Sequence, residues 1–253
     1  MEEMLELIER TIDEVLIKGR PEVLSDAMRY AVGTGGKRIR PLICIGSAIA
    51  VGGKMEDAKY PAVAIELLHN YTLIHDDLPA MDNDIERRGK PTVWKKFGEA
   101  NAILTGDALL SLAYQVAAMS PRRVKEIVEV LGAKGVGVVC GQVEDITRGE
   151  GADYDYIYEH KTADLFIAAA MMGGYAGGGS AEEVAQLERF ALNLGLAFQY
   201  EDDLLDGDSP YSIEKTNSLV KSTTDAAISA LSRLGGNTVF LQSLANKLIG
   251  RSK

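Results

Sequence analysis

The chain has 253 residues, a hydrophobic fraction of 46% and a formal net charge of −10. This length fits one large domain or two small ones, and the hydrophobic fraction is enough for a sizeable core. The negative charge, with no basic stripe, argues against nucleic-acid binding, which needs a positive surface, but a local cationic site could still bind small anions.

The N-terminal stretch MEEMLELIER is acidic and amphipathic, and it lacks the basic start and apolar core of a signal peptide. No stretch reaches the roughly 18 uncharged apolar residues of a membrane span, so we expect no stable membrane insertion. The two cysteines, Cys44 and Cys140, lie in apolar or Gly-rich runs. We expect both to be buried structural thiols in a reducing, cytoplasmic compartment.

Helical periodicity dominates the chain, and strand-like alternation is scarce. Apolar residues recur at helical spacing over 4–16, Pro61 opens a helix that runs to about His75, Pro121 opens another, and 181–196 is a further helix. Glycine clusters are expected to separate the helices; they lie at 35–36, 52–53, 173–174, 177–179 and 235–236. With no linker or repeat, the pattern predicts one all-α domain of about ten helices in a large bundle.

The stretch HDDLPAMDNDIERRG, residues 75–89, concentrates carboxylates at the end of an apolar helix. Asp76 and Asp77 end the helix, Pro79 then disturbs the backbone, and Asp82 returns a third carboxylate. The stretch FQYEDDLLD, residues 198–206, repeats the pattern. There Asp202 and Asp203 share one helix face with Asp206, and like charges at this spacing destabilise a helix unless something cationic compensates them.

Carboxylate oxygens are the ligands that Mg²⁺ prefers, and the ion usually takes one or two of them and completes its shell with water and substrate phosphate. Two Asp-rich helix ends that face each other across a cavity would therefore hold Mg²⁺ ions against a diphosphate. A solvated surface is the alternative explanation for either cluster alone. Two clusters of the same form, both ending apolar helices, favour the metal site.

A diphosphate also needs cations from the protein, and several lie beside the Asp motifs. They are Lys37, Arg38 and Arg40 in GGKRIRP, Arg87 and Arg88 after the first motif, Lys161 in HKTADLF, and Lys215 after the second motif. Arginine offers phosphate a bidentate fork, whereas lysine acts as a point charge. His69 lies two helical turns before Asp76 on nearly the same face, where a purely structural histidine is the alternative.

These blocks resemble the trans-isoprenyl diphosphate synthases, the group of the farnesyl and geranylgeranyl diphosphate synthases. The matching stretches, in the family's order, are GGKRIRP, LLHNYTLIHDDLPAMDNDIERRGKPT, FGEANAILTGDALL, GQVEDI, HKTADLF and FQYEDDLLD, from Gly35 to Asp206. The resemblance implies an all-α isoprenoid-synthase bundle around a deep central cavity. It also implies a cytoplasmic homodimer in which residues 1–253 form a single polyprenyl synthetase domain.

The resemblance also assigns roles to individual residues. It implies that two or three Mg²⁺ ions bind at Asp76, Asp77, Asp82 and Asp202, with Asp203 and Asp206 completing the second motif. The allylic diphosphate would be held by Arg87, Lys161 and Lys215, and isopentenyl diphosphate by Lys37, Arg40, His69 and Arg88. Thr162 and Gln199 would lie beside the reacting carbons. The residues expected to be catalytic are Asp76, Asp77, Arg87, Lys161, Thr162, Gln199 and Asp202.

The implied reaction is condensation of isopentenyl diphosphate with C5 and C10 allylic diphosphates. Mg²⁺ and cationic side chains would stabilise the departing diphosphate, and an apolar cavity would protect the allylic cation from water. The fifth and fourth residues before Asp76 are Tyr71 and Thr72, which are expected to limit chain length. A bulky Tyr71 favours farnesyl diphosphate, but if it only packs in the bundle, geranylgeranyl diphosphate stays open.

The segment after Asp206 departs from the family pattern. The stretch GDSPYSIEKTNSLV keeps one lysine, Lys215, where relatives have a longer loop with further lysines, so the C-terminal part is expected to be shortened. Two alternatives therefore stay open: a non-catalytic regulatory subunit of a heteromeric synthase, and a class I terpene cyclase. The intact second motif argues against the cyclase.

Overall fold

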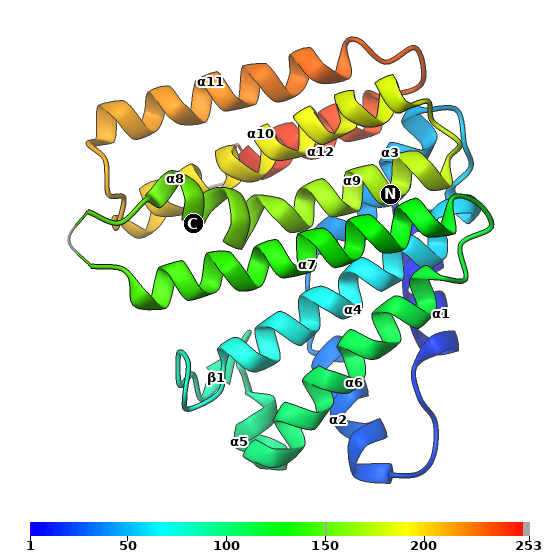
Figure 1. The fold of residues 1–253 in the computed structure, drawn as a ribbon, viewed down its shortest axis with the longest axis vertical. Coiled ribbons are helices and arrows are strands. Elements are labelled where there is room, and N and C mark those ends of the chain that lie inside the picture. Colours follow the sequence, from blue (N-terminus) through cyan, green and yellow to red (C-terminus); the bar gives the residue numbers. More distant parts are fainter. Residues whose placement is uncertain (150, 250–253) are drawn as a thin grey trace.

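A computed structural model describes residues 1–149 and 151–249, and this part of the chain is almost wholly α-helical (Figure 1). The elements are α1 (Glu2–Val15), α2 (Glu22–Gly33), α3 (Ile39–Ala50), the 3₁₀ helix η1 (Met55–Ala58), α4 (Lys59–Asp76), β1 (Glu86–Arg87), β2 (Lys90–Pro91), α5 (Val93–Phe97), α6 (Glu99–Ala117), α7 (Val124–Thr147), α8 (Tyr154–Ile157), the π-helix η2 (Tyr158–Ala163), α9 (Asp164–Ala176), α10 (Ala181–Asp206), α11 (Ile213–Leu231) and α12 (Val239–Ile249). The expected all-α class is confirmed.

The helix predicted from Pro61 to His75 is observed as α4, and the helix predicted over 181–196 continues to Asp206 as α10. Ser180 and Glu183 form a reciprocal capping box that fixes the start of α10. The prediction that Gly173 and Gly174 separate two helices was wrong, because both lie inside α9. Cys140 was also predicted wrongly: it is exposed, whereas Cys44 is buried as expected.

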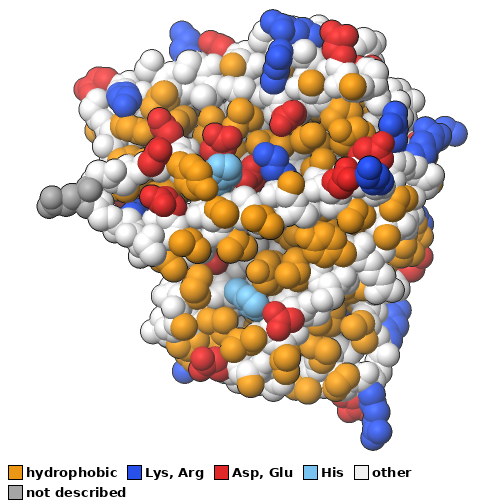
Figure 2. All heavy atoms as spheres, in the orientation of Figure 1, with side chains coloured by type: hydrophobic (Ala, Val, Ile, Leu, Met, Phe, Trp, Pro, Cys, Tyr) orange, Lys and Arg blue, Asp and Glu red, His pale blue; other side chains and the backbone are white. Residues whose placement is uncertain are grey.

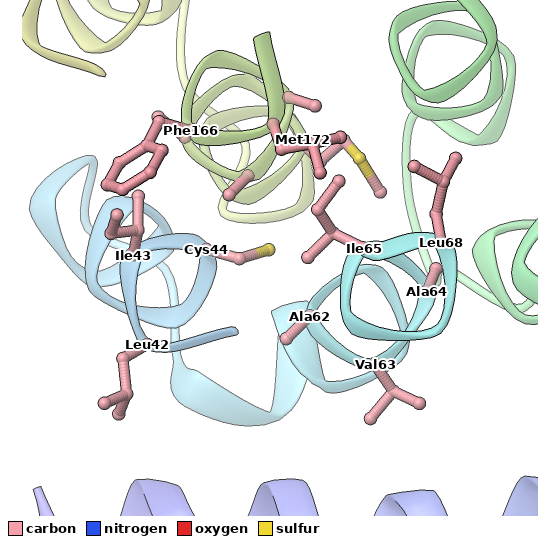
Figure 3. Packing of buried hydrophobic residues seen from close by; sticks show 14 of the residues in the cluster. Leu42, Ile43, Cys44, Ala62, Val63, Ala64, Ile65, Leu68, Phe166 and Met172 are labelled. Carbon is pink, nitrogen blue, oxygen red and sulfur yellow. The ribbon is translucent and has the colours of Figure 1, made fainter. Parts of the chain in front are cut away.

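Helices α3, α4 and α9 pack together in the interior (Figure 3). The buried side chains of Cys44 and Ile65 point toward the space between these helices, where Met172 of α9 also lies. A Cβ atom on Gly173 would collide with the carbonyl group of Cys44, so only glycine lets α9 approach α3 this closely. Gly173 therefore allows close packing between two helices and does not end a helix.

The helices that carry the two Asp motifs end on the same side of the bundle. In Figure 1, α4, α7 and α10 run toward the left-hand side, while η2 and α9 run back between α7 and α10. The hairpin of β1 and β2 follows the end of α4. Over residues 1–149 and 151–249, no helix combines the length and the apolar character that crossing a membrane requires.

Candidate active site

A cavity of about 540 Å³ opens between α4, α7, η2 and α10. Its lining is mostly apolar with several charged and polar groups, and it comprises Arg40, His69, Tyr71, Thr72, Leu73, His75, Asp76, Leu78, Ala80, Met81, Val138, Val139, Gln142, Val143, Ile146, Lys161, Thr162, Leu165, Phe198 and Gln199. An apolar cleft with a few convergent polar groups is the usual form of a small-molecule site.

Asp76 is the last residue of α4 and lies in the cavity wall. The backbone N–H of Asp82 donates to the carbonyl oxygen of Asp76 at 2.9 Å, so the loop folds the third carboxylate of the motif back toward the first. Burial raises the pKa of Asp76 to about 6; nearby Lys161 opposes the rise and Asp82 adds to it. The ionised carboxylate is therefore under-compensated in the protein alone.

Asp77 is 3% exposed and is paired with Arg87 of strand β1. The Nε and Nη2 atoms of Arg87 lie 2.8 and 2.7 Å from Oδ1 of Asp77. Burial raises the pKa of Asp77 even though the hydrogen bond from Arg87 acts against the rise. The hairpin thus holds the Arg87 guanidinium beside the first motif.

The second motif occupies the last turns of α10, where Asp202 is partly buried, Asp203 is buried and Asp206 is exposed. Asp203 accepts a hydrogen bond from Tyr158 at Oδ2 and one from Gln199 at Oδ1. Gln199 in turn accepts a hydrogen bond from Thr162 at 2.7 Å.

Lys161 and Thr162 belong to the π-helix η2, a turn with one extra residue that often occurs at functional sites. Lys161 donates to Oδ2 of Asp145 on α7 at 2.5 Å. The approach of η2 depends on Gly141, because a Cβ there would collide with the backbone of Lys161. Sequence reasoning did not single out Asp145, although the GQVEDI block contains it.

Arg40 and His69 form a second polar group in the cavity wall. Nη1 of Arg40 lies 3.1 Å from Nε2 of His69, and the guanidinium stacks over the ring of Phe166. Burial lowers the pKa of Arg40 to about 10. Burial, followed by the charge of Arg40, lowers the pKa of His69 well below its usual range, so the imidazole is neutral.

Two polar atoms of this pair are buried and have no hydrogen-bond partner among the described residues: Nε of Arg40 and Nδ1 of His69. Arginine has no acceptor, so Nε is a donor. Because Nε2 of neutral His69 accepts from Arg40, its Nδ1 carries the proton and is a donor too. Two unpaired donors beside a cavity suit an anionic ligand.

Several predicted substrate-binding cations lie elsewhere. Lys37 is exposed, and Arg88 donates to the carbonyl oxygen of Gly35 in the loop before α3. Lys215 lies over the ring of Tyr211, at a separate pocket that Asp155 and Tyr200 also line. The structure therefore brings Arg40, His69 and Lys161 to the cavity, but it does not bring Lys215 there.

Arg38, the remaining cation of GGKRIRP, is 6% exposed and is held by the protein itself. It contacts Glu9 at 2.7 Å and Glu66 at 2.8 Å, and it donates to the carbonyl oxygen of Val32. Arg38 therefore links α1, α2 and α4 and has no free face for a ligand.

Tyr71 and Thr72 both line the cavity, as their expected role in chain length requires. The ring of Tyr71 meets the ring of His75 edge to face, with 4.8 Å between centroids. His75 packs over Gly106, where a Cβ would strike its ring. Sequence reasoning missed His75, whose place depends on this glycine of α6.

No cluster of three or more His, Cys, Asp or Glu side chains in the described residues is close enough to hold a metal ion by itself. The donor set nevertheless fits Mg²⁺, which usually binds one or two carboxylates and takes its remaining ligands from water and phosphate. The raised pKa of Asp76 agrees with this, because a cation beside it would favour the ionised carboxylate.

An α-helical bundle with carboxylates and cations in and beside the wall of a largely apolar cavity defines the architectural class of the isoprenoid synthases. The chain belongs to the family described as Polyprenyl synthetase, which matches residues 21–227. Its fold matches the crystal structure of an FPP/GFPP synthase from Zymomonas mobilis, with a TM-score of 0.90, 33% identity and 98% of each chain covered.

Two curated relatives are similar in sequence. The chloroplastic geranylgeranyl pyrophosphate synthase of Capsicum annuum is 42% identical over 213 residues, which cover 79% of this chain and 57% of the relative. The chloroplastic heterodimeric geranylgeranyl pyrophosphate synthase large subunit 1 of Arabidopsis thaliana is 44% identical over 220 residues, covering 79% and 58%. The chain thus spans less than two thirds of the length of these relatives.

Proposed function

We propose that the protein is a short-chain trans-prenyltransferase that condenses isopentenyl diphosphate with C5 and C10 allylic diphosphates to give farnesyl diphosphate. The observation that carries this proposal is the composition of the cavity wall. Its apolar part suits a prenyl chain, and the same wall contains Asp76, Lys161, Arg40 and His69. Family membership supports the same conclusion.

Isopentenyl diphosphate is assigned to the Arg40–His69 pair. An unpaired buried donor costs about 1–3 kcal/mol, and Nε of Arg40 and Nδ1 of His69 are both unpaired. The oxygens of a diphosphate are acceptors suited to such donors. Arg88 and Lys37 are assigned to the same diphosphate; Arg88 adds positive charge here, since it lowers the pKa of both Arg40 and His69.

The allylic diphosphate is assigned to the Asp motifs, where Asp76, Asp77, Asp82, Asp202 and Asp206 are the proposed donors for two or three Mg²⁺ ions. Asp203, which was also expected to bind metal, is left out of this set because both of its oxygens accept hydrogen bonds from the protein. When bound, Mg²⁺ would neutralise charge that develops on the leaving diphosphate. Arg87 and Lys161, now paired with Asp77 and Asp145, would turn to the diphosphate oxygens. Lys215 would have to leave Tyr211 to join them.

The remaining residues orient the reacting carbons and keep water out. Thr162 and Gln199 line the cavity beside Lys161, where carbon–oxygen cleavage would leave an allylic cation. The apolar side chains of Leu165 and Phe198 exclude water from it. The released diphosphate would take the proton after the new carbon–carbon bond forms.

Chain length is assigned to Tyr71, which lines the cavity and is braced by His75. A braced ring favours a C15 product, whereas the two relatives compared above are geranylgeranyl pyrophosphate synthases. We predict that Tyr71→Ala lengthens the main product by one C5 unit or more, and that Tyr71→Phe leaves it unchanged. Identical product lengths for all three proteins would exclude Tyr71 as the cavity floor.

A homodimer is supported by an apolar surface on α6 and α7. Figure 2 shows hydrophobic side chains gathered across the middle of this face. The exposed members on these helices are Ile103, Leu104, Val124, Val136, Val139, Val143 and Ile146, and the exposed Met119 lies in the connection between the two helices. A second copy is the occupant that also completes the cavity, because Val139, Val143 and Ile146 lie both on this surface and in the cavity wall.

The chain is proposed to act as one polyprenyl synthetase domain over residues 1–253, of which 150 and 250–253 lie outside the described residues. Its position in the cytoplasm stays a prediction. The segment after Asp206 supplies Lys215 to the proposed site, although none of its residues lines the cavity.

The test is a product assay with the purified protein, Mg²⁺, labelled isopentenyl diphosphate, and the C5, C10 and C15 allylic diphosphates in turn. Elongation of C5 and C10 that stops at C15 is the expected result. Elongation to C20 would keep the function and change the product. Product from an allylic diphosphate alone would identify a cyclase. No product would favour a regulatory subunit, as in a heterodimeric synthase.

A further inference from the structure

Four side chains form one continuous chain of hydrogen bonds between the π-helix η2 and α10. Tyr158 and Thr162 are four residues apart on η2, and Gln199 and Asp203 are four residues apart on α10. Thr162 Oγ1 donates to Gln199 Oε1 at 2.7 Å, Gln199 Nε2 donates to Asp203 Oδ1 at 2.8 Å, and Tyr158 OH donates to Asp203 Oδ2 at 2.5 Å. These hydrogen bonds thus connect η2 to α10.

The direction of each bond follows from chemistry. An ionised carboxylate only accepts hydrogen bonds, so Asp203 must face the NH₂ group of the Gln199 amide. The amide oxygen of Gln199 then faces Thr162, and the hydroxyl of Thr162 donates its only proton to that oxygen. Thr162 therefore presents acceptor lone pairs, and no donor, to its remaining surroundings.

Those surroundings include the cavity, whose wall contains Thr162 and Gln199 but neither Asp203 nor Tyr158. Asp203 is 6% exposed and Tyr158 is 7% exposed, beside the rings of Tyr154 and Tyr200. Burial, followed by the hydrogen bond to Asp203, raises the pKa of Tyr158, so its hydroxyl stays protonated and remains a donor. Each oxygen of Asp203 thus has a protein donor.

We propose that Asp203 and Tyr158 are positioning residues that fix the Gln199 amide, and through it make Thr162 an oriented acceptor toward the reacting carbons. On the proposed function, on which this inference rests, an acceptor oxygen beside an allylic cation stabilises positive charge, whereas a hydroxyl proton turned the other way would oppose it. Asp203 serves this network and not the metal ions, despite its place in the second Asp motif.

The test compares Tyr158→Phe, Asp203→Asn and the matched control Tyr211→Phe. The control also removes one tyrosine hydroxyl that donates to a carboxylate, here Asp155 at 2.8 Å, but it lies outside the network. Loss of one hydrogen bond to a charged group corresponds to about 10–100-fold in a rate constant. We expect kcat to fall by about this factor in Tyr158→Phe and Asp203→Asn, with KM for both diphosphates and the half-maximal Mg²⁺ concentration within about twofold.

A second readout needs neither metal nor substrate. The side-chain amide signal of Gln199 in ¹H–¹⁵N spectra, assigned from its loss in Gln199→Glu, should shift in Tyr158→Phe and Asp203→Asn and stay in place in Tyr211→Phe. An unmoved signal in both network variants would overturn the proposal. So would a more than tenfold rise in the Mg²⁺ requirement of Asp203→Asn, because that result identifies a metal ligand. An inactive wild-type protein would refute the proposed function, while the amide signal would still test the network.

Discussion

At the scale of single residues, the cavity wall contains a carboxylate whose charge lowers the stability of the folded protein. Asp76 lies in the cavity wall with its pKa raised to about 6, chiefly by burial. Such groups are typical of functional sites, because the ligand that would compensate them is not part of the protein. Removing the charge should therefore stabilise the protein without ligand, at a pH where the carboxylate is ionised.

We predict that Asp76→Asn raises the free energy of unfolding by about 1–2 kcal/mol at pH 8, less than the roughly 3 kcal/mol of a two-unit shift because Asp76 is partly exposed. The raised pKa favours the protonated form in the folded state, so its stabilising contribution is complete below about pH 4 and is lost as the pH rises through about 6. Urea unfolding in EDTA at pH 4 and pH 8 measures the difference.

The exposed Asp26 supplies the control, since Asp26→Asn should change the stability little at either pH. An equal effect of Asp76→Asn at pH 4 and pH 8 would show that the gain comes from packing and not from charge. A loss of stability at pH 8 would mean that Asp76 is compensated in the protein alone.

Arg40 gives a second test at this scale, because its Nε is an unpaired buried donor. Lysine keeps the charge but has neither Nε nor the planar fork. We predict that Arg40→Lys and Arg40→Met both raise KM for isopentenyl diphosphate by about tenfold or more, equivalent to the loss of one charged hydrogen bond. KM for the allylic diphosphate should stay within about twofold. A wild-type KM for isopentenyl diphosphate in Arg40→Lys would show that Arg40 contributes only its charge.

At the scale of elements, local periodicity made α4 and α10 predictable, and the spacing of Asp202 and Asp206 placed them on one helix face. The π-helix η2 was not predictable, because local periodicity carries no information about its close approach to α7 at Gly141. Gly173 was misread for the same reason: a glycine that separates helices and a glycine that lets helices approach look alike in one sequence. The position of Lys215 could not be predicted either. It depends on the path of the segment between α10 and α11, which tertiary contacts determine.

The packing role of Gly173 leads to a prediction on stability. Gly173→Ala should lower the free energy of unfolding by about 1–3 kcal/mol, because the added methyl group meets the carbonyl of Cys44 on α3 and the backbone has to move. Gly132→Ala on α7 is the matched control. Its Cβ would meet only the side chain of Tyr114, at ordinary distances of 3.5 and 3.8 Å, so the gain in helix propensity of up to about 1 kcal/mol should appear.

Thermal and urea unfolding of the two variants beside the wild type give the comparison. Opposite signs for Gly173→Ala and Gly132→Ala are expected. If Gly173→Ala were as stable as Gly132→Ala, the contact between α3 and α9 would be loose enough to absorb a methyl group. The two glycines would then have no distinct packing roles.

At the scale of the whole molecule, the cavity and the apolar surface of α6 and α7 share a wall. Val139, Val143 and Ile146 are each at least 46% exposed and also line the cavity. A single copy therefore leaves part of this cavity wall open to water. We infer that assembly and the proposed activity depend on the same helix, and that a monomer would expose an allylic cation to hydrolysis.

The decisive variants change the surface without touching the cavity wall. Leu104 and Val136 are 58% and 64% exposed, and neither lines the cavity. We predict that Leu104→Glu combined with Val136→Glu gives a folded monomer by light scattering, because buried carboxylates at a dimer contact would be unpaired.

Val239→Glu is the control. It changes a side chain that is 71% exposed on α12, and it should leave a dimer. In the monomer, elongation should fall and hydrolysis of the allylic diphosphate should rise. A fully active monomer would show that α7 alone keeps water from the cavity, and a wild-type monomer would refute the homodimer itself.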